Sequence, residues 1–209
     1  MTERLSALQA VAGPVSRETI ARIEAFEAAF QKWSARINLA APSTLPHLWE
    51  RHILDSAQLM ALAPKEAKWL DLGSGGGFPG AVIAILIAER EGARIDLVES
   101  NHKKAAFLQT TLAALKAPAT VHARRIEECY EQISPPGVIT ARALAPLTIL
   151  FGLMEPWMKG EARALLHKGR DYQREVEESR DAWRFDLVEH ENKVGGDGVI
   201  LEVSNLRRL

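Results

Sequence analysis

The length, composition and charge of the chain exclude several classes of protein. Its 209 residues are 47% hydrophobic and 25% charged, as in one compact domain with a short appendage. No apolar run approaches the ~18 residues of a membrane span, and the first residues lack a signal-peptide profile. Cys129 is the single cysteine, which excludes an internal disulfide and a cysteine metal cluster. We therefore expect a cytoplasmic protein without a metal, and the net charge of −1 argues mildly against nucleic acid as a partner.

Residues 1–65 have the periodicity of helices. Ser16 is a plausible N-cap, and the apolar residues that follow it recur at helical spacing: Ile20, Ile23, Phe26, Phe30, Trp33 and Ile37. A second helix is expected from about Ser43 to a point before Pro64, with Pro46 in its first turn. We expect residues 1–65 to form an N-terminal helical extension.

From residue 67 onward, short β-rich runs alternate with helical ones. Helices are expected near 80–90, 101–116, 145–158 and 170–182, and strands at Lys68–Leu72, Arg94–Glu99, Thr120–Ala123, Val138–Ala141, Ala162–His167, Phe185–Glu189 and Val199–Val203. This alternation predicts a mostly parallel sheet with helices on both faces. Because residues 192–198 resemble a turn, the last two strands should form an antiparallel hairpin. Seven strands in this layout are typical of the class I, Rossmann-like α/β fold of S-adenosylmethionine-dependent methyltransferases, which we assign to residues 66–209.

A glycine-rich loop, residues 71–80, follows the first strand. Read from Gly75, it matches the G-x-G-x-x-G fingerprint of dinucleotide-binding proteins, but such a match arises easily in a glycine-rich run. Read from Asp71, it is an acid-x-G-x-G sequence directly at the strand end, the form found in methyltransferases, where Gly73 and Gly75 would lie along the cofactor. Pro79 is acceptable at the start of the following helix. The second reading is favoured, while a dinucleotide site and a purely structural turn remain alternatives.

Two further positions at strand ends fit a nucleoside ligand. Glu99 closes the second strand, where an acid would accept hydrogen bonds from ribose hydroxyls, although a solvated acid is the simpler interpretation. After the third strand, Ile126 could pack on adenine with Glu127 at its polar edge. A helix start enriched in acids would explain the same residues.

The methyl acceptor is constrained by what the sequence lacks. Pyrimidine C5 methylation needs a cysteine nucleophile, and Cys129 follows the third strand, where a packed thiol is the better interpretation. Residues 134–137 (Ser-Pro-Pro-Gly) resemble an amine-methylation motif but precede the fourth strand, so we interpret them as a turn. A purine N7 needs no base to remove a proton.

Basic residues beyond strand ends predict a local RNA-binding rim, although each alone is more often a solvated surface: Lys103, Lys104, Arg124, Arg125 and Lys168.

Taken over most of its length, the chain resembles the GidB family. The resemblance is carried by Lys32-Trp33, Asn38-Leu39, Arg51–Ser56, Asp71–Gly80, Arg125–Glu128, Ile139–Ala143 and His167–Gly169. It implies transfer of methyl from S-adenosylmethionine to N7 of one guanine of 16S rRNA, guanine-527 in the 530 loop, on naked rRNA or on the small ribosomal subunit. It also implies cofactor contacts at Gly73, Phe78, Ile126, Glu127 and Arg142. Arg142 follows the fourth strand and is assigned a positioning role, with a simple ion pair as the alternative.

The segment Arg51–Ser56 contains His, Asp and Ser, but its spacing does not suit a hydrolytic triad. Arg51 and Asp55 are expected to pair at i,i+4, and the helix to cover the cofactor crevice or help bind RNA. The final strand lacks the basic residues associated with the family, for which Arg207 and Arg208 are possible substitutes. A small-molecule methyltransferase, an NAD(P)-dependent oxidoreductase and a non-enzymatic RNA-binding protein remain alternative functions.

Overall fold

The computed structural model describes residues 2–209, and these form a seven-stranded sheet in the order β3-β2-β1-β4-β5-β7-β6. The pairs among β1 to β5 are parallel, whereas β7 runs antiparallel to both β5 and β6. The predicted fold class and terminal hairpin are therefore confirmed. The strands are β1 (Lys68–Leu72), β2 (Arg94–Val98), β3 (Ala119–His122), β4 (Val138–Arg142), β5 (Arg163–Lys168), β6 (Trp183–Glu191) and β7 (Val199–Arg208).

The helices lie close to the predicted positions. They are α1 (Thr2–Ala12), α2 (Arg17–Ser34), α3 (Asp55–Ala57), α4 (Leu59–Leu62), α5 (Gly80–Leu86), α6 (His102–Ala114), α7 (Leu147–Met154) and α8 (Tyr172–Ser179), with short 3-10 turns η1 (Pro42–His47), η3 (Ile126–Cys129) and η4 (Glu155–Trp157). Ser16 caps α2 as expected, because its Oγ accepts a hydrogen bond from the Thr19 N–H at 3.0 Å.

The second predicted helix has the expected position but a different form. It begins as η1, widens into the π-helix η2 (Trp49–Leu54) and continues as α3 and α4, ending before Pro64. Pro46 lies inside η1 and lacks the N–H that a regular α-helix would use. The wider π turn changes which side chains of Arg51–Ser56 lie one turn apart, with consequences for the site.

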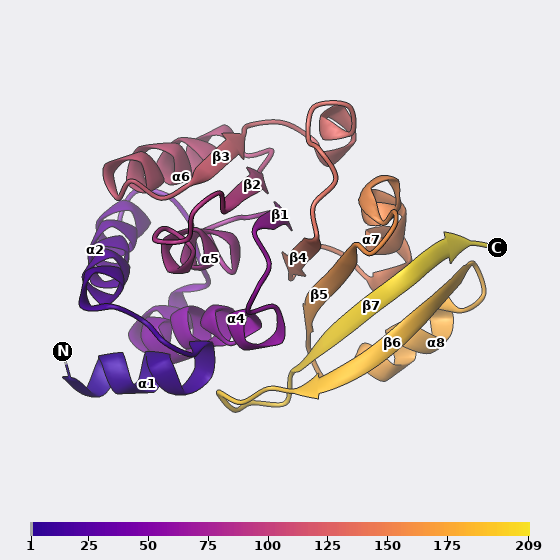
Figure 1. Ribbon diagram of the computed structural model, residues 1–209, viewed down its shortest axis with the longest axis horizontal. Helices are drawn as coiled ribbons and strands as arrows, with labels where there is room; N and C mark the ends of the chain where they lie inside the picture. Colours follow the sequence, from indigo (N-terminus) through magenta and orange to yellow (C-terminus); the bar gives the residue numbers. More distant parts are fainter. Residues whose placement is uncertain (1) are drawn as a thin grey trace.

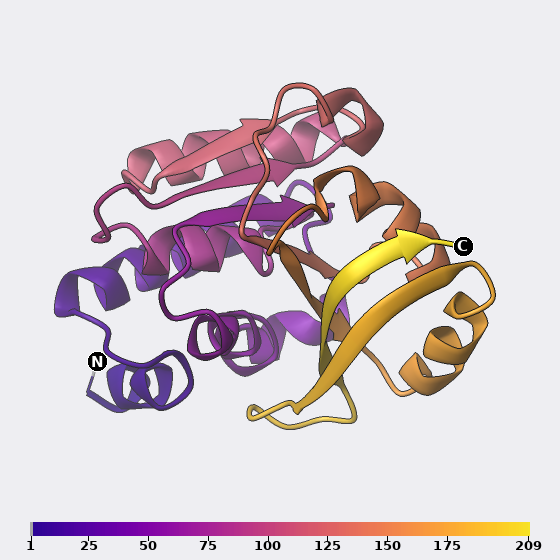
Figure 2. The same cartoon turned by 45° about the vertical axis from the view of Figure 1, so that its right-hand side comes forward.

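Alternating side chains of the strands separate two hydrophobic cores. On β1, Trp69 joins the cluster that contains α1, α2, α5 and α6, while Leu70 and Leu72 join the cluster that contains α7 and α8. Figures 1 and 2 show these two groups of helices on opposite sides of the sheet. The N-terminal helices thus pack into the same core as the parallel strands, which holds residues 44–55 against the carboxyl ends of β4 and β5.

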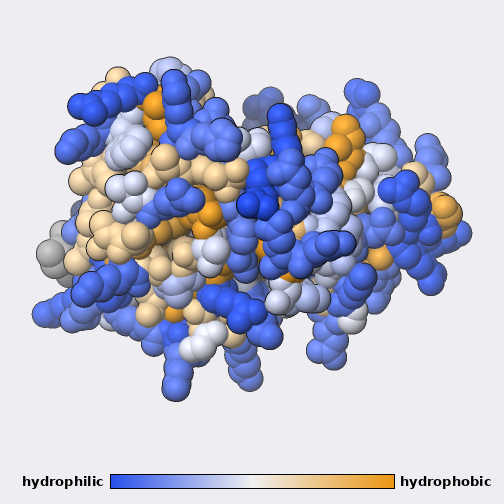
Figure 3. Space-filling model, turned by 90° about the horizontal axis from the view of Figure 1, so that it is seen from above, coloured by the Kyte–Doolittle hydropathy of each residue, from blue (hydrophilic) through white to orange (hydrophobic). Residues whose placement is uncertain are grey.

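The surface is mostly hydrophilic. Figure 3 shows one face, with a paler, mildly hydrophobic area on the left and hydrophilic side chains over most of the remainder. Within residues 2–209, the large hydrophobic side chains that are exposed are Ile149, Val188 and Leu209. No helix in this part of the chain is long and apolar enough to cross a bilayer.

Candidate cofactor and acceptor pockets

The loop between β1 and α5 folds tightly because its glycines adopt conformations that other residues avoid. Gly73 and Gly75 have φ values of +67° and +55°, in the left-handed region. The Ser74 N–H donates to the Val98 carbonyl at 3.0 Å, and the Gly75 N–H donates to the Glu99 carboxylate at 2.7 Å. The loop is therefore anchored to the end of β2.

Asp71 supports the loop from within the protein. It is fully buried, and its Oδ1 accepts a hydrogen bond from the Thr140 hydroxyl on β4 at 2.7 Å. Burial raises the pKa of the Asp71 carboxyl from 3.8 to about 6, because desolvation disfavours the charged form. Asp71 does not line the pocket described next, so we infer a supporting role for it.

A cavity of about 450 Å³ lies beside this loop, and we call it the glycine-loop pocket. The structure brings together at this pocket all the residues predicted to bind the cofactor: Gly73, Gly75, Phe78, Glu99, Ile126, Glu127 and Arg142. They come from the ends of β1, β2 and β4 and from η3, as expected where the carboxyl ends of parallel strands meet. The arrangement suits an elongated ligand with a nucleoside at one end.

Glu99 has a second role beyond the one predicted for it. Its Oε1 accepts from the Asn101 N–H at 2.7 Å, while its Oε2 accepts from Gly75. The carboxylate thus joins the glycine loop to the start of α6, and its orientation is fixed before any ligand binds. Cys129 on η3 is buried, in agreement with the packed-thiol interpretation. Burial also raises the pKa of its thiol.

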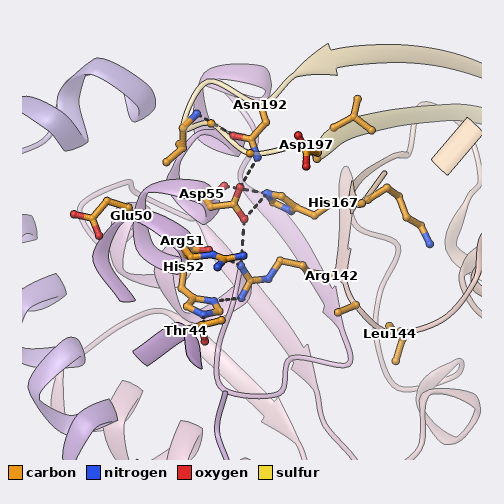
Figure 4. Close-up of a pocket in the computed structure, with 18 of the residues that line it drawn as sticks. Thr44, Glu50, Arg51, His52, Asp55, Arg142, Leu144, His167, Asn192 and Asp197 are labelled. Carbon is orange, nitrogen blue, oxygen red and sulfur yellow. Dashed lines mark hydrogen bonds and ion pairs between the residues drawn. The ribbon is translucent and has the colours of Figure 1, made fainter. Parts of the chain in front are cut away.

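Arg142 ends β4 and forms one wall of the pocket. Its Nη1 donates to Asp55 Oδ2 at 3.1 Å and to the Arg51 carbonyl at 3.2 Å, and its Nη2 donates to His52 Nδ1 at 2.6 Å. The guanidinium carbon lies 5.3 Å from the centre of the Phe78 ring, within cation–π range. The ion pair that was the alternative interpretation of Arg142 therefore exists, with Asp55 as the partner. It holds the Arg142 side chain at the wall of the pocket (Figure 4).

The Arg142 contact determines the protonation of His52. Arginine can only donate, so Nδ1 of His52 carries the lone pair and Nε2 carries the hydrogen. Nε2 is 2.9 Å from the Thr44 hydroxyl, which itself donates to the Ala41 carbonyl at 2.8 Å. Burial, with Arg142 as a second cause, lowers the pKa of His52 from 6.5 to about 4. The imidazole is thus neutral at physiological pH and stacks on Phe78 with 4.9 Å between ring centres.

The predicted pair between Arg51 and Asp55 does not form among the described residues, because Asp55 is used elsewhere. Its Oδ1 accepts from Asn192 Nδ2 at 2.8 Å and from Gln58 Nε2 at 3.0 Å. Its carbonyl lies 2.9 Å from His167 Nε2. In the π-helical turn of η2, residues four apart are not aligned as in an α-helix, and Asp55 instead faces Arg142. Asp55, the first residue of α3 directly after η2, therefore connects this segment to β4, β5 and the β6–β7 turn (Figure 4).

A second cavity of about 730 Å³ lies on the other side of Arg142, and we call it the hairpin pocket because the β6–β7 turn lines it. It shares five residues with the glycine-loop pocket: Thr44, His52, Arg142, Ala143 and Leu144. Lys168, Glu175 and Asn192 line its remaining walls. Within residues 2–209, no group of three His, Cys, Asp or Glu side chains is placed to hold a metal ion.

The basic residues predicted to bind RNA do not gather in one rim. Lys104, Arg124 and Arg125 border the glycine-loop pocket, and Lys103 is exposed beside them on α6. Lys168 instead lines the hairpin pocket, where its Nζ contacts Glu175 at 2.6 Å.

Arg207 and Arg208 lie at the end of β7, whereas Val199 at its start lines the hairpin pocket. About 30 Å of strand separates the two ends. These arginines are therefore remote from both pockets.

Sequence reasoning missed most of the hairpin pocket. Asp55 lies 87 residues before its partner Arg142 and 137 residues before its partner Asn192. Sequence spacing therefore gives no indication of these contacts. Two features of the sequence could have indicated this pocket. His167-Lys168 lies at the end of a predicted strand, and a predicted turn follows Glu191; the predicted topology places both at this edge of the sheet.

Comparison with known proteins identifies close relatives. A family model described as GidB, rRNA small subunit methyltransferase G, matches residues 19–199. The ribosomal RNA small subunit methyltransferase G of Chelativorans sp. (strain BNC1) is 76% identical over 209 residues, which is 100% of both chains. The protein of that name from Brucella canis is 58% identical, covering 98% of this chain and 96% of its own.

Solved structures share the fold at low sequence identity. Aeropyrum pernix fibrillarin in complex with natively bound S-adenosyl-L-methionine superposes with a TM-score of 0.57 and 19% identity, over 74% of this chain and 75% of that one. A mutant of MtNAS in complex with S-adenosylmethionine gives a TM-score of 0.56 and 16% identity, over 88% of this chain and 71% of that one. The class I methyltransferase fold is thereby established.

Proposed function

The chain belongs to the GidB family of rRNA small subunit methyltransferase G proteins, and from that premise we propose its substrate and site. It is an rRNA methyltransferase that uses S-adenosylmethionine, and we propose that it methylates N7 of guanine-527 in the 530 loop of 16S rRNA. The observation that carries the proposal is a pair of pockets that share the wall formed by Arg142 and His52. An enzyme of this kind would work in the bacterial cytoplasm.

The residues of the glycine-loop pocket fit this cofactor. Glu99 is already oriented by two backbone N–H groups and retains acceptor capacity for ribose hydroxyls. Ile126 presents an apolar surface for adenine, and the loop at Gly73 and Gly75 leaves room for the methionine part. When bound, S-adenosylmethionine supplies an electrophilic methyl group.

The hairpin pocket then takes the acceptor base. Guanine N7 carries a lone pair, so alignment with the methyl group is the main requirement. Arg142 is fixed by Asp55, His52 and Phe78, and we propose that it positions the two substrates on either side of it. Neutral His52 adds no positive charge beside the purine, which becomes cationic as N7 is methylated.

We further propose that residues 1–65 act as a helical extension that completes the site of the methyltransferase domain, residues 66–209. Thr44 and His52 from this extension line both pockets. The exposed Lys103 and the pocket-edge residues Lys104, Arg124 and Arg125 would contact rRNA phosphates.

The test is transfer of labelled methyl from S-adenosylmethionine to three acceptors: deproteinised 16S rRNA, small ribosomal subunits, and a metabolite pool. We expect label in rRNA, mapped as 7-methylguanosine at one position that is unmodified in cells lacking the protein. Label confined to metabolites would favour a small-molecule methyltransferase, and tight binding of NAD(P) in place of S-adenosylmethionine would favour an oxidoreductase.

A further inference from the structure

We propose that Lys168 and Glu175 determine base specificity by reading the Watson–Crick edge of the acceptor guanine in the hairpin pocket. The inference rests on the proposed function and extends it to residues for which no such role was predicted. Lys168 ends β5 and Glu175 lies on α8. Both line the pocket on the walls that are not shared with the glycine-loop pocket.

The two side chains are held in place by their surroundings. Lys168 Nζ donates to Glu175 Oε2 at 2.6 Å and to the Ala145 carbonyl at 2.9 Å. The same Oε2 accepts from the Leu147 N–H at 2.8 Å. The exposed fractions of the two side chains are 10% and 26%, so a ligand in the pocket would replace most of the remaining solvent.

These contacts leave capacity for a ligand. An ammonium has three N–H groups, and two of those on Lys168 are used. Glu175 Oε1 has no hydrogen-bond partner among residues 2–209, since both hydrogen bonds to this carboxylate go to Oε2. The pair therefore offers one donor next to one charged acceptor.

A donor next to a charged acceptor matches guanine. Guanine presents O6 as an acceptor, with N1–H and N2–H as donors beside it. Lys168 would donate to O6, and Glu175 Oε1 would accept from N1–H and N2–H. Adenine presents the opposite pattern, an N6 donor beside the N1 acceptor, which would leave the third N–H of Lys168 and Oε1 of Glu175 without partners. Because unpartnered buried polar groups are costly, adenine would be rejected.

The geometry also fits the direction of transfer. Arg142 and Leu144 are shared by the two pockets, so the edge of the base that carries N7 must face this wall. Lys168 and Glu175 line the hairpin pocket alone, and a base held by its Watson–Crick edge at that pair can point N7 toward the shared wall. Recognition and alignment would then come from one placement of the base.

The test compares guanosine with inosine, which lacks only the N2 amino group, at the target position of the rRNA acceptor. We expect the wild-type protein to prefer guanosine by about 10- to 100-fold in kcat/KM, as for loss of one hydrogen bond to a charged group. In Glu175→Gln the activity on both acceptors should fall, because both keep the N1–H that the carboxylate accepts from. It should fall further for guanosine, which also loses the contact of its N2–H, so the preference shrinks. Glu178→Gln is the matched control on the same helix, where Glu178 pairs with Arg174 outside the pocket.

Lys168→Met provides a second, distinguishable readout. Guanosine and inosine both retain O6, so this substitution should lower kcat/KM for the two acceptors by the same factor and preserve the preference. If Glu175→Gln fails to fold, Glu175→Asp replaces it, with a partial loss of preference expected from the shorter side chain.

The outcomes separate the two proposals. If the wild-type protein methylates no guanosine at N7, the proposed function itself is contradicted. A wild-type protein that methylates guanosine, but whose preference over inosine is absent or survives the change at Glu175, would overturn the inference alone.

Discussion

The glycine-loop pocket and the hairpin pocket adjoin each other but are built in different ways. The first is formed mainly by strand ends and their loops, including the glycine loop, with Thr44 and His52 of the N-terminal extension on one side. The second is formed by four separate segments joined through the side chain and carbonyl of Asp55. A local motif thus shapes the first pocket, where we propose that the cofactor binds, whereas long-range side-chain contacts shape the second, where we propose that the acceptor binds.

The largest effect is expected where the glycine-loop pocket has no spare room. In Gly73→Val, a Cβ at φ +67° would lie 2.6 Å from Leu144 Cδ1, and the side chain would enter the pocket. We expect binding of S-adenosylhomocysteine, measured by calorimetry, to weaken by about 100-fold or more, equivalent to about 3 kcal/mol. Gly92→Val is the control, because Gly92 has φ +71° with open space around it. Similar binding losses in both variants would show that backbone strain, and not the pocket, is responsible.

The hairpin pocket should respond through stability as well as activity. Asp55→Asn removes the countercharge of Arg142, and their side chains are 13% and 18% exposed. Breaking a fully buried pair costs about 3–5 kcal/mol, so we expect about 2–3 kcal/mol less free energy of unfolding in urea, together with lower kcat/KM. Glu89→Gln breaks the exposed Arg22–Glu89 pair and should cost under about 1 kcal/mol. Equal costs would contradict the central position of Asp55.

The same contrast explains what the sequence predicts well. Asp71, Gly73 and Gly75 belong to one continuous motif, and Glu99, Ile126 and Arg142 follow strands whose ends must meet in a parallel sheet. The part of the glycine-loop pocket built by strand ends could therefore be assembled from local patterns and the topology alone, whereas the contribution of Thr44 and His52 could not. Its residues are placed as predicted, while their contacts with the cofactor remain a proposal.

The hairpin pocket could not be predicted in this way. The expected i,i+4 pair between Arg51 and Asp55 assumed an α-helical turn. The chain instead forms the π-helix η2 at this point, and whether a segment adopts a π-helix depends on its tertiary packing. The strands of the hairpin were also predicted too short, since β6 reaches from Trp183 to Glu191 and β7 to Arg208. The first part of β6 does alternate in burial, beginning with the buried Trp183, whereas its last residues are polar and mostly exposed on an edge strand and give little alternation to detect.

The pH dependence of stability should have opposite signs for Asp71, which supports the glycine loop from within the protein, and for His52, which lines both pockets. The folded-state pKa of Asp71 is about 6, above 3.8, so the folded state binds more protons in this window. The free energy of unfolding therefore decreases there by up to about 3 kcal/mol as pH rises. The folded-state pKa of His52 is about 4, below 6.5, so the unfolded state binds more protons. Stability then increases with pH in that window, by about 1–2 kcal/mol because solvent screens the partly exposed ring.

Two variants separate these contributions in urea unfolding from about pH 4 to about pH 7. Asp71→Asn should remove the decrease and make stability rise more steeply with pH. His52→Gln, which keeps an acceptor for Arg142, should remove the increase. If both variants follow the wild-type profile, neither group titrates as its environment indicates.

The smallest effect is expected at the exposed edge of the glycine-loop pocket. Lys103→Ala removes an exposed charge beside Lys104 in the first turn of α6, which Asn101 caps. For one lost phosphate contact we expect KM for rRNA to rise about 2- to 5-fold with kcat unchanged, and the difference to shrink at higher salt. Lys65→Ala is the matched control, because Lys65 is exposed just before β1, at the opposite end of the strand from the glycine loop. Equal effects of the two substitutions would mean that the overall charge of the protein controls its encounter with RNA. An effect at Lys103 alone would locate the RNA backbone on the α6 side of the glycine-loop pocket.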